Sequence, residues 1–120
     1  MGVVEFDVPW PPSVNRYYRH VGPRVLISRE GRKYRRMAVS RLGGLFEKFS
    51  GAVALSLDCY PPDRRRRDID NILKCLLDSL VNAGVMEDDS LVRRLLMEMR
   101  EPIEGGLVHV HIAPLPERRG

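Results

Sequence analysis

The sequence predicts a single α+β domain in which a sheet is flanked by two helices. Residues 3–8 and 107–112 alternate apolar and polar side chains, as a strand with one buried face does. Residues 69–80 instead repeat apolar side chains at helical spacing. The length of 120 residues suits one domain with one core, so we expect a single domain over residues 1–120.

The first half of the chain is expected to hold a strand, a helix and a second strand. The prolines after residue 8 end the first strand, because proline has no N–H to donate. Residues 25–27 are a candidate short strand, and Ser28 suits a helix N-cap. The pair Gly43-Gly44 weakens the second half of the helix, where we expect a kink, and residues 52–60 indicate a central strand. The apolar positions of this helix are Tyr34, Met37, Ala38, Leu42, Leu45, Phe46 and Phe49.

The second helix has the clearest pattern. Gly84 suits the position after its end, and Asp68 suits its N-cap, where a carboxylate accepts from free amides. A polar arc lies opposite the apolar stripe, because residues advance by about 100° each. The stripe holds Ile69, Ile72, Leu73, Leu76, Leu77 and Leu80, and the polar arc holds Asp70, Asn71, Lys74 and Asp78.

The last third of the chain contains one ambiguous segment. Residues 91–100 fit an amphipathic helix and also, less regularly, one face of a strand. Residues 107–112 fit a strand, and residues 114–120 are expected to form a loose tail.

Two segments combine groups that bind a nucleic-acid backbone. Residues 64–67 are four arginines in a row, whose repulsion a polyanion would relieve. Residues 15–20 interleave aromatic rings with cations, so they can stack on bases while contacting phosphate. The alternatives are a solvated arginine loop and tyrosines that pack in the core. The net charge of +4 and the arginine excess fit a polyanionic partner, and a genome rich in G and C would also explain the excess. The predicted nucleic-acid contacts are Arg64, Arg65, Arg66, Arg67, Asn71, Asn15, Arg16, Tyr17 and Arg19.

Several other classes of protein do not fit the sequence. The first residues lack the charged and apolar regions of a signal peptide, and no apolar run is long enough to span a bilayer. We therefore expect a soluble cytoplasmic protein without a membrane partner. Cys59 and Cys75 lack zinc or disulfide spacing, and no phosphate-binding loop indicates a nucleotide cofactor. His109 and His111 share a strand face but have no convincing third zinc ligand.

Acidic residues on both sides of the second helix could hold a hard cation. Asp68 and Asp70 lie two residues apart at its start, and Asp88 or Asp89 could close the site from the turn after it. Lys74 could pair with Asp70 or reach a phosphate oxygen. The alternative gives each group a structural role. Asp68 is then an N-cap, Asp70, Lys74 and Asp78 form a salt-bridge ladder, and residues 88–90 form a turn.

Two blocks of the sequence resemble the RusA-type Holliday junction resolvases. Pro9-Trp10-Pro11-Pro12-Ser13-Val14-Asn15-Arg16-Tyr17-Tyr18-Arg19-His20 resembles the opening of that family. Residues 62–71, followed by Lys74, Asp78, Leu80, Ala83-Gly84 and Asp88-Asp89, resemble its central signature. The likeness covers nearly the whole chain and is weak between residues 21 and 57.

The resemblance implies a homodimeric endonuclease, often encoded by phages or prophages, that nicks opposing strands of four-way DNA junctions and needs Mg²⁺ or Mn²⁺. It implies that Asp68, Asp70 and Asp89 bind the metal and that Lys74 takes part in catalysis. It also favours a strand over residues 91–100, which gives the order β-α-β-α-β-β and a mixed sheet. Our hypothesis is that the metal activates water for attack on phosphorus. The alternatives are a junction-binding protein that does not cut, and a metal nuclease for other branched DNA or RNA.

Overall fold

The computed structural model describes residues 2–116, which form one mixed sheet, one separate hairpin and three α-helices. The sheet has the strand order β1-β6-β4-β5, in which β4 and β5 are parallel and the other neighbours antiparallel. The hairpin pairs β2 with β3. The elements are β1 (Val4–Val8), α1 (Val14–Tyr17), β2 (Tyr18–Val21), β3 (Arg24–Ile27), α2 (Arg29–Leu42), β4 (Val53–Tyr60), the 3₁₀ turn η1 (Ile69–Ile72), α3 (Leu73–Asn82), the 3₁₀ turn η2 (Asp89–Leu91), β5 (Val92–Met99) and β6 (Leu107–Pro114).

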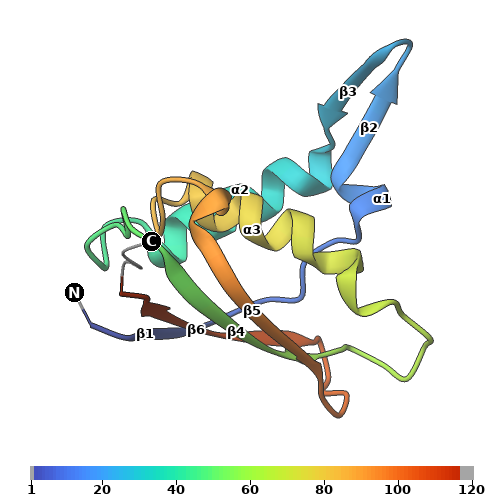
Figure 1. Ribbon diagram of the computed structural model, residues 1–120. Coiled ribbons are helices and arrows are strands. Elements are labelled where there is room, and N and C mark those ends of the chain that lie inside the picture. The colour runs from blue at the N-terminus through green and yellow to red at the C-terminus, as the bar shows by residue number, and fades with distance from the viewer. Residues whose placement is uncertain (1, 117–120) are drawn as a thin grey trace.

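The core lies between one face of the sheet and the two long helices. In Figure 1, α2 and α3 lie together on the same face of the sheet. Strand β4 alternates buried and half-buried residues, so that its buried face meets the apolar stripe of α3. The other face of the sheet carries polar side chains such as Ser56, Asp58 and His111, which are half-buried. The buried side chains of the core include Val53, Leu55, Leu57, Leu76, Leu80, Val108, Val110 and Ile112.

The predicted α+β class, the mixed sheet and the strand over residues 91–100 are confirmed, the last as β5. The predicted order is incomplete, because it omits α1 and strands β2 and β3 of the hairpin. The first long helix was also predicted to run past Gly43-Gly44 with a kink, and this is wrong. It ends at Leu42, and Gly44 takes a positive φ of 77° that stops the helix. Phe46, in the following loop, instead stacks on Phe6 of β1 with ring centroids 5.6 Å apart.

Two predictions at the ends of elements need correction. Asp68 does occupy an N-cap, that of the turn η1 which precedes α3, and its carbonyl accepts from the Asn71 N–H at 3.1 Å. Its side chain accepts no capping hydrogen bond, so the predicted carboxylate cap is wrong. The tail was expected to be loose from residue 114. Pro114 instead ends β6, and the Leu115 N–H donates to the Ala52 carbonyl at 2.8 Å. Residues 117–120 of that predicted tail lie outside the described residues.

Cys59 and Cys75 form no disulfide, and both are buried. Burial raises the pKa of the Cys59 thiol to about 11 and that of the Cys75 thiol to about 12. Both thiols therefore stay protonated at neutral pH, and neither is a candidate nucleophile or metal ligand.

Among residues 2–116, none of the helices combines the length and the apolar composition that a membrane-spanning segment needs.

His109 joins strands β1 and β6 through two carboxylates. Its Nδ1 lies 2.7 Å from Asp7 Oδ1 and its Nε2 lies 3.1 Å from Glu5 Oε1. These contacts, first with Asp7 and then with Glu5, raise the pKa of His109 above its ordinary value of 6.5. The ring is thus held by acidic neighbours, and no group of three metal-ligating side chains forms around it within residues 2–116.

We expect this contact to make stability depend on pH. A histidine whose pKa is raised by folding stabilises the protein fully below pH 6.5, and this contribution is lost as pH rises through the folded-state value. His109→Gln should therefore lower the free energy of unfolding more at about pH 6 than at about pH 9. Urea unfolding of both proteins at the two pH values measures this. An equal loss at both values would contradict it.

Candidate functional site

The segment that joins β4 to α3 carries most of the predicted site. Asp68 lies in extended backbone at φ −80° and ψ 133°, and Asp70 follows in the first turn of η1. Turn η1 contacts strand β5, and turn η2, which begins at Asp89, contacts α3. Asp70 and Asp89 therefore lie on elements that pack around the same helix and strand.

The aspartates fall into two groups according to their partners. Within residues 2–116, Asp68, Asp70 and Asp89 have no ion pair and no side-chain hydrogen bond. Their carboxylates are exposed or half-buried, so they are open to a ligand. All other aspartates have a partner in the fold: Asp7 with His109, Asp58 with Arg100, Asp63 with Arg65 and Arg67, Asp78 with Arg35 and Tyr17, and Asp88 with Ser90.

The structure separates the roles of Asp88 and Asp89. The Asp88 carboxylate accepts from the backbone N–H of Ser90 at 3.1 Å and from the Ser90 hydroxyl, and so caps η2. These hydrogen bonds, the side-chain one first, lower the pKa of Asp88. The cap satisfies Asp88 and leaves Asp89 as the unpaired acid of the pair.

The three unpaired aspartates are not assembled into a metal site. No three His, Cys, Asp or Glu side chains in the described part of the chain lie close enough together to hold a metal ion. Unpaired carboxylates repel one another, and this opposes their close approach unless a cation lies between them. Their chemistry fits Mg²⁺, because that ion binds carboxylate oxygens while keeping several of its own waters.

Lys74 does not belong to a salt-bridge ladder. In residues 2–116 it forms no ion pair with Asp70 or Asp78, although both lie one helical turn away. Asp78 binds Arg35 instead, with Arg35 Nη2 and Asp78 Oδ2 2.7 Å apart. The alternative in which Asp70, Lys74 and Asp78 form a salt-bridge ladder is therefore wrong. The exposed Lys74 ammonium remains available to an anion.

The four consecutive arginines do not behave alike. Arg67 is mostly buried and braces its own loop, since its Nη1 lies 2.8 Å from Asp63 Oδ1 and donates to the carbonyls of Asp63 and Arg65. Its guanidinium also lies 5.9 Å from the centroid of the Trp10 ring. The side chains of Arg64 and Arg65 are 83% and 82% exposed, and Arg66 is exposed as well. A direct phosphate contact therefore fits Arg64, Arg65 and Arg66 better than it fits Arg67.

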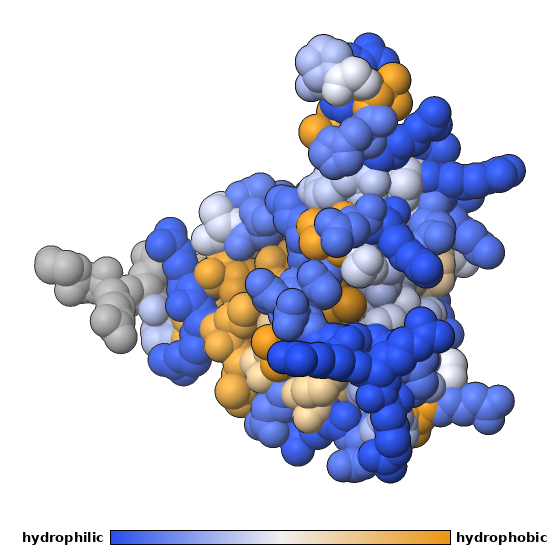
Figure 2. Space-filling model, turned by 90° about the vertical axis from the view of Figure 1, so that its right-hand side faces the viewer, coloured by the Kyte–Doolittle hydropathy of each residue, from blue (hydrophilic) through white to orange (hydrophobic). Residues whose placement is uncertain are grey.

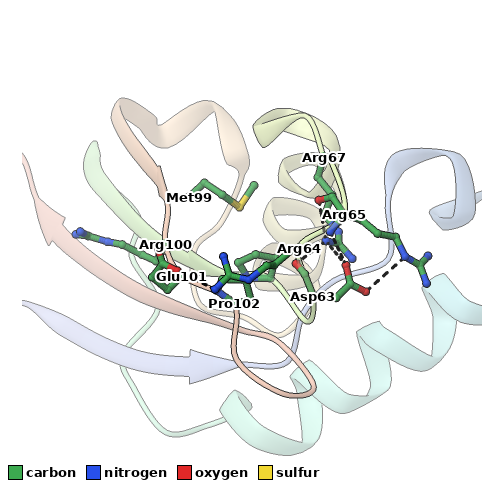
Figure 3. A pocket seen from close by; sticks show the side chains of 9 residues that line it. Asp63, Arg64, Arg65, Arg67, Met99, Arg100, Glu101 and Pro102 are labelled. Carbon is green, nitrogen blue, oxygen red and sulfur yellow. Dashed lines mark hydrogen bonds and ion pairs between the residues drawn. The ribbon is translucent and has the colours of Figure 1, made fainter.

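A hollow of about 220 Å³ lies between this loop and the residues after β5. Arg64, Arg100 and Glu101 are among the residues that line it. Figure 3 shows Asp63 in contact with Arg65 and Arg67 beside it. The ion pair between Arg64 and Glu101 is long, at 3.7 Å, and both side chains are strongly exposed. Such a pair contributes little and can open to admit a phosphate.

The segment over residues 15–20 forms the end of α1 and the start of β2. One of its predicted nucleic-acid contacts, Tyr17, is wrong. Asn15, Arg16 and Arg19 are exposed, as a backbone contact requires. Tyr17 is fully buried, so its predicted stacking on a nucleic acid is wrong. Its ring packs in a small cluster with Tyr34 and Cys75.

The Tyr17 hydroxyl links three helices through a partly buried polar network. It donates to the Asp78 carboxylate of α3 and accepts from Arg35 Nε of α2 at 3.0 Å. Burial, and then the hydrogen bond with Asp78, raise the pKa of Tyr17 well above its ordinary value. The hydroxyl therefore stays protonated and fixes α1 against α2 and α3.

The sequence interpretation missed this network, strand β2 and its pairing with β3, whereas the candidate short strand over residues 25–27 is confirmed as part of β3. No local pattern marks the network, because Asp78 lies 43 and 61 residues from its two partners in the chain. The hairpin does leave a signal. Two short runs of strand-forming residues, 18–21 and 24–27, flank the two-residue loop Gly22-Pro23.

Comparison with known proteins gives one consistent family. The family model described as "Endodeoxyribonuclease RusA" matches residues 9–113. The chain is 37% identical over 117 residues to the crossover junction endodeoxyribonuclease rusA of Enterobacteria phage 82, with 96% of this chain and 98% of the relative covered. It is 36% identical to the crossover junction endodeoxyribonuclease RusA of Shigella sonnei strain Ss046 and 35% identical to that of Escherichia coli strain K12, with the same coverage.

Proposed function

The chain belongs to the RusA endodeoxyribonuclease family, and from that premise we propose that it resolves four-way DNA junctions by nicking opposing strands. The relatives that it matches over nearly their whole length are named crossover junction endodeoxyribonucleases. The single structural observation that supports a hydrolytic site is the set of unpaired aspartates, Asp68, Asp70 and Asp89, beside a loop of exposed arginines.

We assign the metal to those three carboxylates. Asp68 and Asp70 enter from the loop before α3 and Asp89 from the turn after it. The site would take Mg²⁺, with Mn²⁺ as a substitute, because all three donors are hard oxygens. When bound, the ion supplies Lewis acidity to the phosphoryl oxygen and lowers the pKa of a bound water.

The remaining residues of the site hold the substrate and balance its charge. Lys74 lies one helical turn from Asp70 and can stabilise the negative charge that develops on the phosphate during cleavage. The exposed guanidiniums of Arg64, Arg65 and Arg66 can hold the backbone on one side. Asn71, half-buried beside Asp70, can donate its amide to a phosphate oxygen.

We also propose that the active form is a homodimer. A four-way junction has two-fold symmetry, and two opposing nicks require two sites related by the same symmetry. Light scattering of the purified protein would give its mass, which should be close to twice the 13.8 kDa of the chain. The match to a protein of Enterobacteria phage 82 supports a phage or prophage origin, with action in the cytoplasm on host or phage DNA.

A substrate panel tests this function against its alternatives. The protein is incubated with a labelled four-way junction, a flapped duplex, a plain duplex and a structured RNA, each with Mg²⁺ and with a chelator. We expect paired nicks in the junction alone, and only with Mg²⁺. Binding without cutting would identify a junction-binding protein, and equal cutting of the flap or the RNA would identify a nuclease of another specificity.

The exposed arginines give a prediction of their own. Arg65→Ala combined with Arg66→Ala should weaken junction binding and lower the slope of log affinity against log salt by about 2, because two phosphate contacts are lost. Arg65→Lys with Arg66→Lys is the matched control, since it keeps both charges and should keep the slope. Fluorescence anisotropy over a range of salt concentrations measures both. A parental slope in the alanine variant would remove these arginines from the interface.

A further inference from the structure

The β2–β3 hairpin projects away from the rest of the molecule and has no assigned role. Figure 1 shows it rising from the ends of α1 and α2, clear of the main sheet. Its outer half is exposed, including the aliphatic residues Val21, Val25 and Leu26, which are 39%, 56% and 39% exposed. Exposed aliphatic side chains at the end of a projecting ribbon indicate a surface that meets a partner.

The strand register sorts these side chains onto two faces. Arg19 pairs with Leu26 and Val21 pairs with Arg24, so these four residues share one face, and all four are exposed. On the other face, Val25 pairs with the exposed His20. The outer hairpin therefore presents aliphatic side chains and cations side by side.

The base of the hairpin is held firmly. The Ser28 N–H donates to the Tyr17 carbonyl at 2.8 Å, and Gly31 packs so closely on Tyr17 that a Cβ at this glycine would lie 2.7 Å from the same carbonyl. Tyr17 in turn binds Asp78 on α3. At the other end, the two-residue loop begins with Gly22 at φ +58°, the sign of φ that a type II′ turn requires there. The hairpin is thus short, braced and fixed to the helix that carries Lys74.

The charge around the hairpin matches a nucleic acid. Arg16, Arg29 and Lys33 flank its base, and Glu30 is the one acidic residue between positions 8 and 46. In Figure 1 the hairpin and the arginine-bearing loop project on the same side, and Figure 2 looks onto that side, with the hairpin and its hydrophobic atoms at the top. A DNA held by the arginine loop can therefore reach the hairpin.

We propose that the outer hairpin is a wedge that enters the branch point of the DNA junction, with Val21, Val25 and Leu26 against base faces and Arg19 and Arg24 on the flanking phosphates. This rests on the proposed junction activity and specifies how the protein distinguishes a junction from a duplex. A two-stranded ribbon fits a DNA groove, and aliphatic side chains can enter between base steps and unstack them. Insertion of the wedge should contribute the most binding free energy at a branch point, because base stacking is already interrupted there. In a continuous duplex the same insertion must first break the stacking of neighbouring base pairs.

The experiment follows base stacking directly. A four-way junction carries 2-aminopurine beside the branch point, and its fluorescence rises when that base unstacks. Binding is measured without divalent ions, so the result does not depend on cleavage. We expect a rise with the parental protein and little or none with the triple variant Val21→Thr, Val25→Thr and Leu26→Thr, which keeps strand-forming side chains. The preference of the variant for junction over duplex in competition binding should fall about tenfold.

Two controls and one fallback make the outcome decisive. Leu45→Thr replaces an exposed aliphatic side chain beyond the far end of α2, about 21 Å from the hairpin by the helix rise over 14 residues, and should behave as the parent. Arg19→Gln with Arg24→Gln should weaken binding to both DNAs and lower the salt slope. If the triple variant does not fold, the single variants Val21→Thr and Val25→Thr replace it, and each should give a smaller loss in the same direction.

Several results would overturn the wedge. These are an equal fluorescence rise with the parent and the variants, no rise with the parent, or a change of the triple variant from dimer to monomer in light scattering, which would make the hairpin a contact between protein copies. None of them depends on cutting. Failure of the proposed function would appear separately, as a parental protein that does not cut junctions in the substrate panel.

Discussion

Asp70→Asn is expected to abolish junction cleavage in Mg²⁺ while leaving junction binding intact or tighter. Asp70 has no partner within residues 2–116, so the substitution removes a metal-binding charge without breaking a contact of the fold. Cleavage should fall by about a thousandfold or more, because a lost ligand removes the ion's stabilisation of the transition state. Junction binding should survive or tighten, because the substitution removes a negative charge that repels the DNA phosphate.

Asp88→Asn is the matched control for this variant. It makes the same change of charge at an aspartate next to Asp89, and asparagine can still cap η2 through its side-chain oxygen. Single-turnover cleavage and gel-shift binding of the same labelled junction give both quantities. Cleavage by Asp70→Asn near the parental rate would remove Asp70 from the chemistry, and a full loss in Asp88→Asn would contradict the assignment of Asp88 to the cap.

Asp78→Ala is expected to give the largest loss of stability among the acidic residues. It leaves the Arg35 guanidinium and the buried Tyr17 hydroxyl without their shared acceptor. The loss should be about 2 kcal/mol, because breaking a network costs the desolvation of the groups left behind, and partial exposure of Asp78 and Arg35 reduces that cost. Urea unfolding followed by circular dichroism gives the value.

A double-mutant cycle separates this network from the general effect of removing an acid. Tyr17→Phe and Asp78→Ala should show a coupling of about 1 kcal/mol, because both remove the same hydrogen bond. Asp89→Ala should change the free energy of unfolding by less than about 0.5 kcal/mol, since Asp89 has no partner in the described part of the chain. Additive losses in the cycle would show that Tyr17 and Asp78 do not act as a unit.

The fold could be predicted where one local pattern decides an element. The alternation in β1 and β6 and the apolar stripe of α3 are visible in the sequence because burial repeats with the period of the strand or helix. The end of α2 was missed because the apolar spacing continues beyond Gly43-Gly44. Leu42 precedes these glycines and is buried as part of the helix. Phe49 follows them and is buried in the loop after the helix, where its backbone pairs with that of Met86.

Residue type and spacing were enough to identify the residues that could do chemistry here: the acids at Asp68, Asp70 and Asp89, the lysine after the first two and the arginines before them. Which of these charged groups already have partners depends on how distant segments of the chain pack together. Asp70 and Asp78 are equally spaced from Lys74, yet within residues 2–116 Asp78 is bound by Arg35 and Tyr17 while Asp70 stays free. The physical reason is that a hydrogen bond depends on distance in space, and the packing of α1 and α2 on α3 brings those distant partners to only one of the two carboxylates.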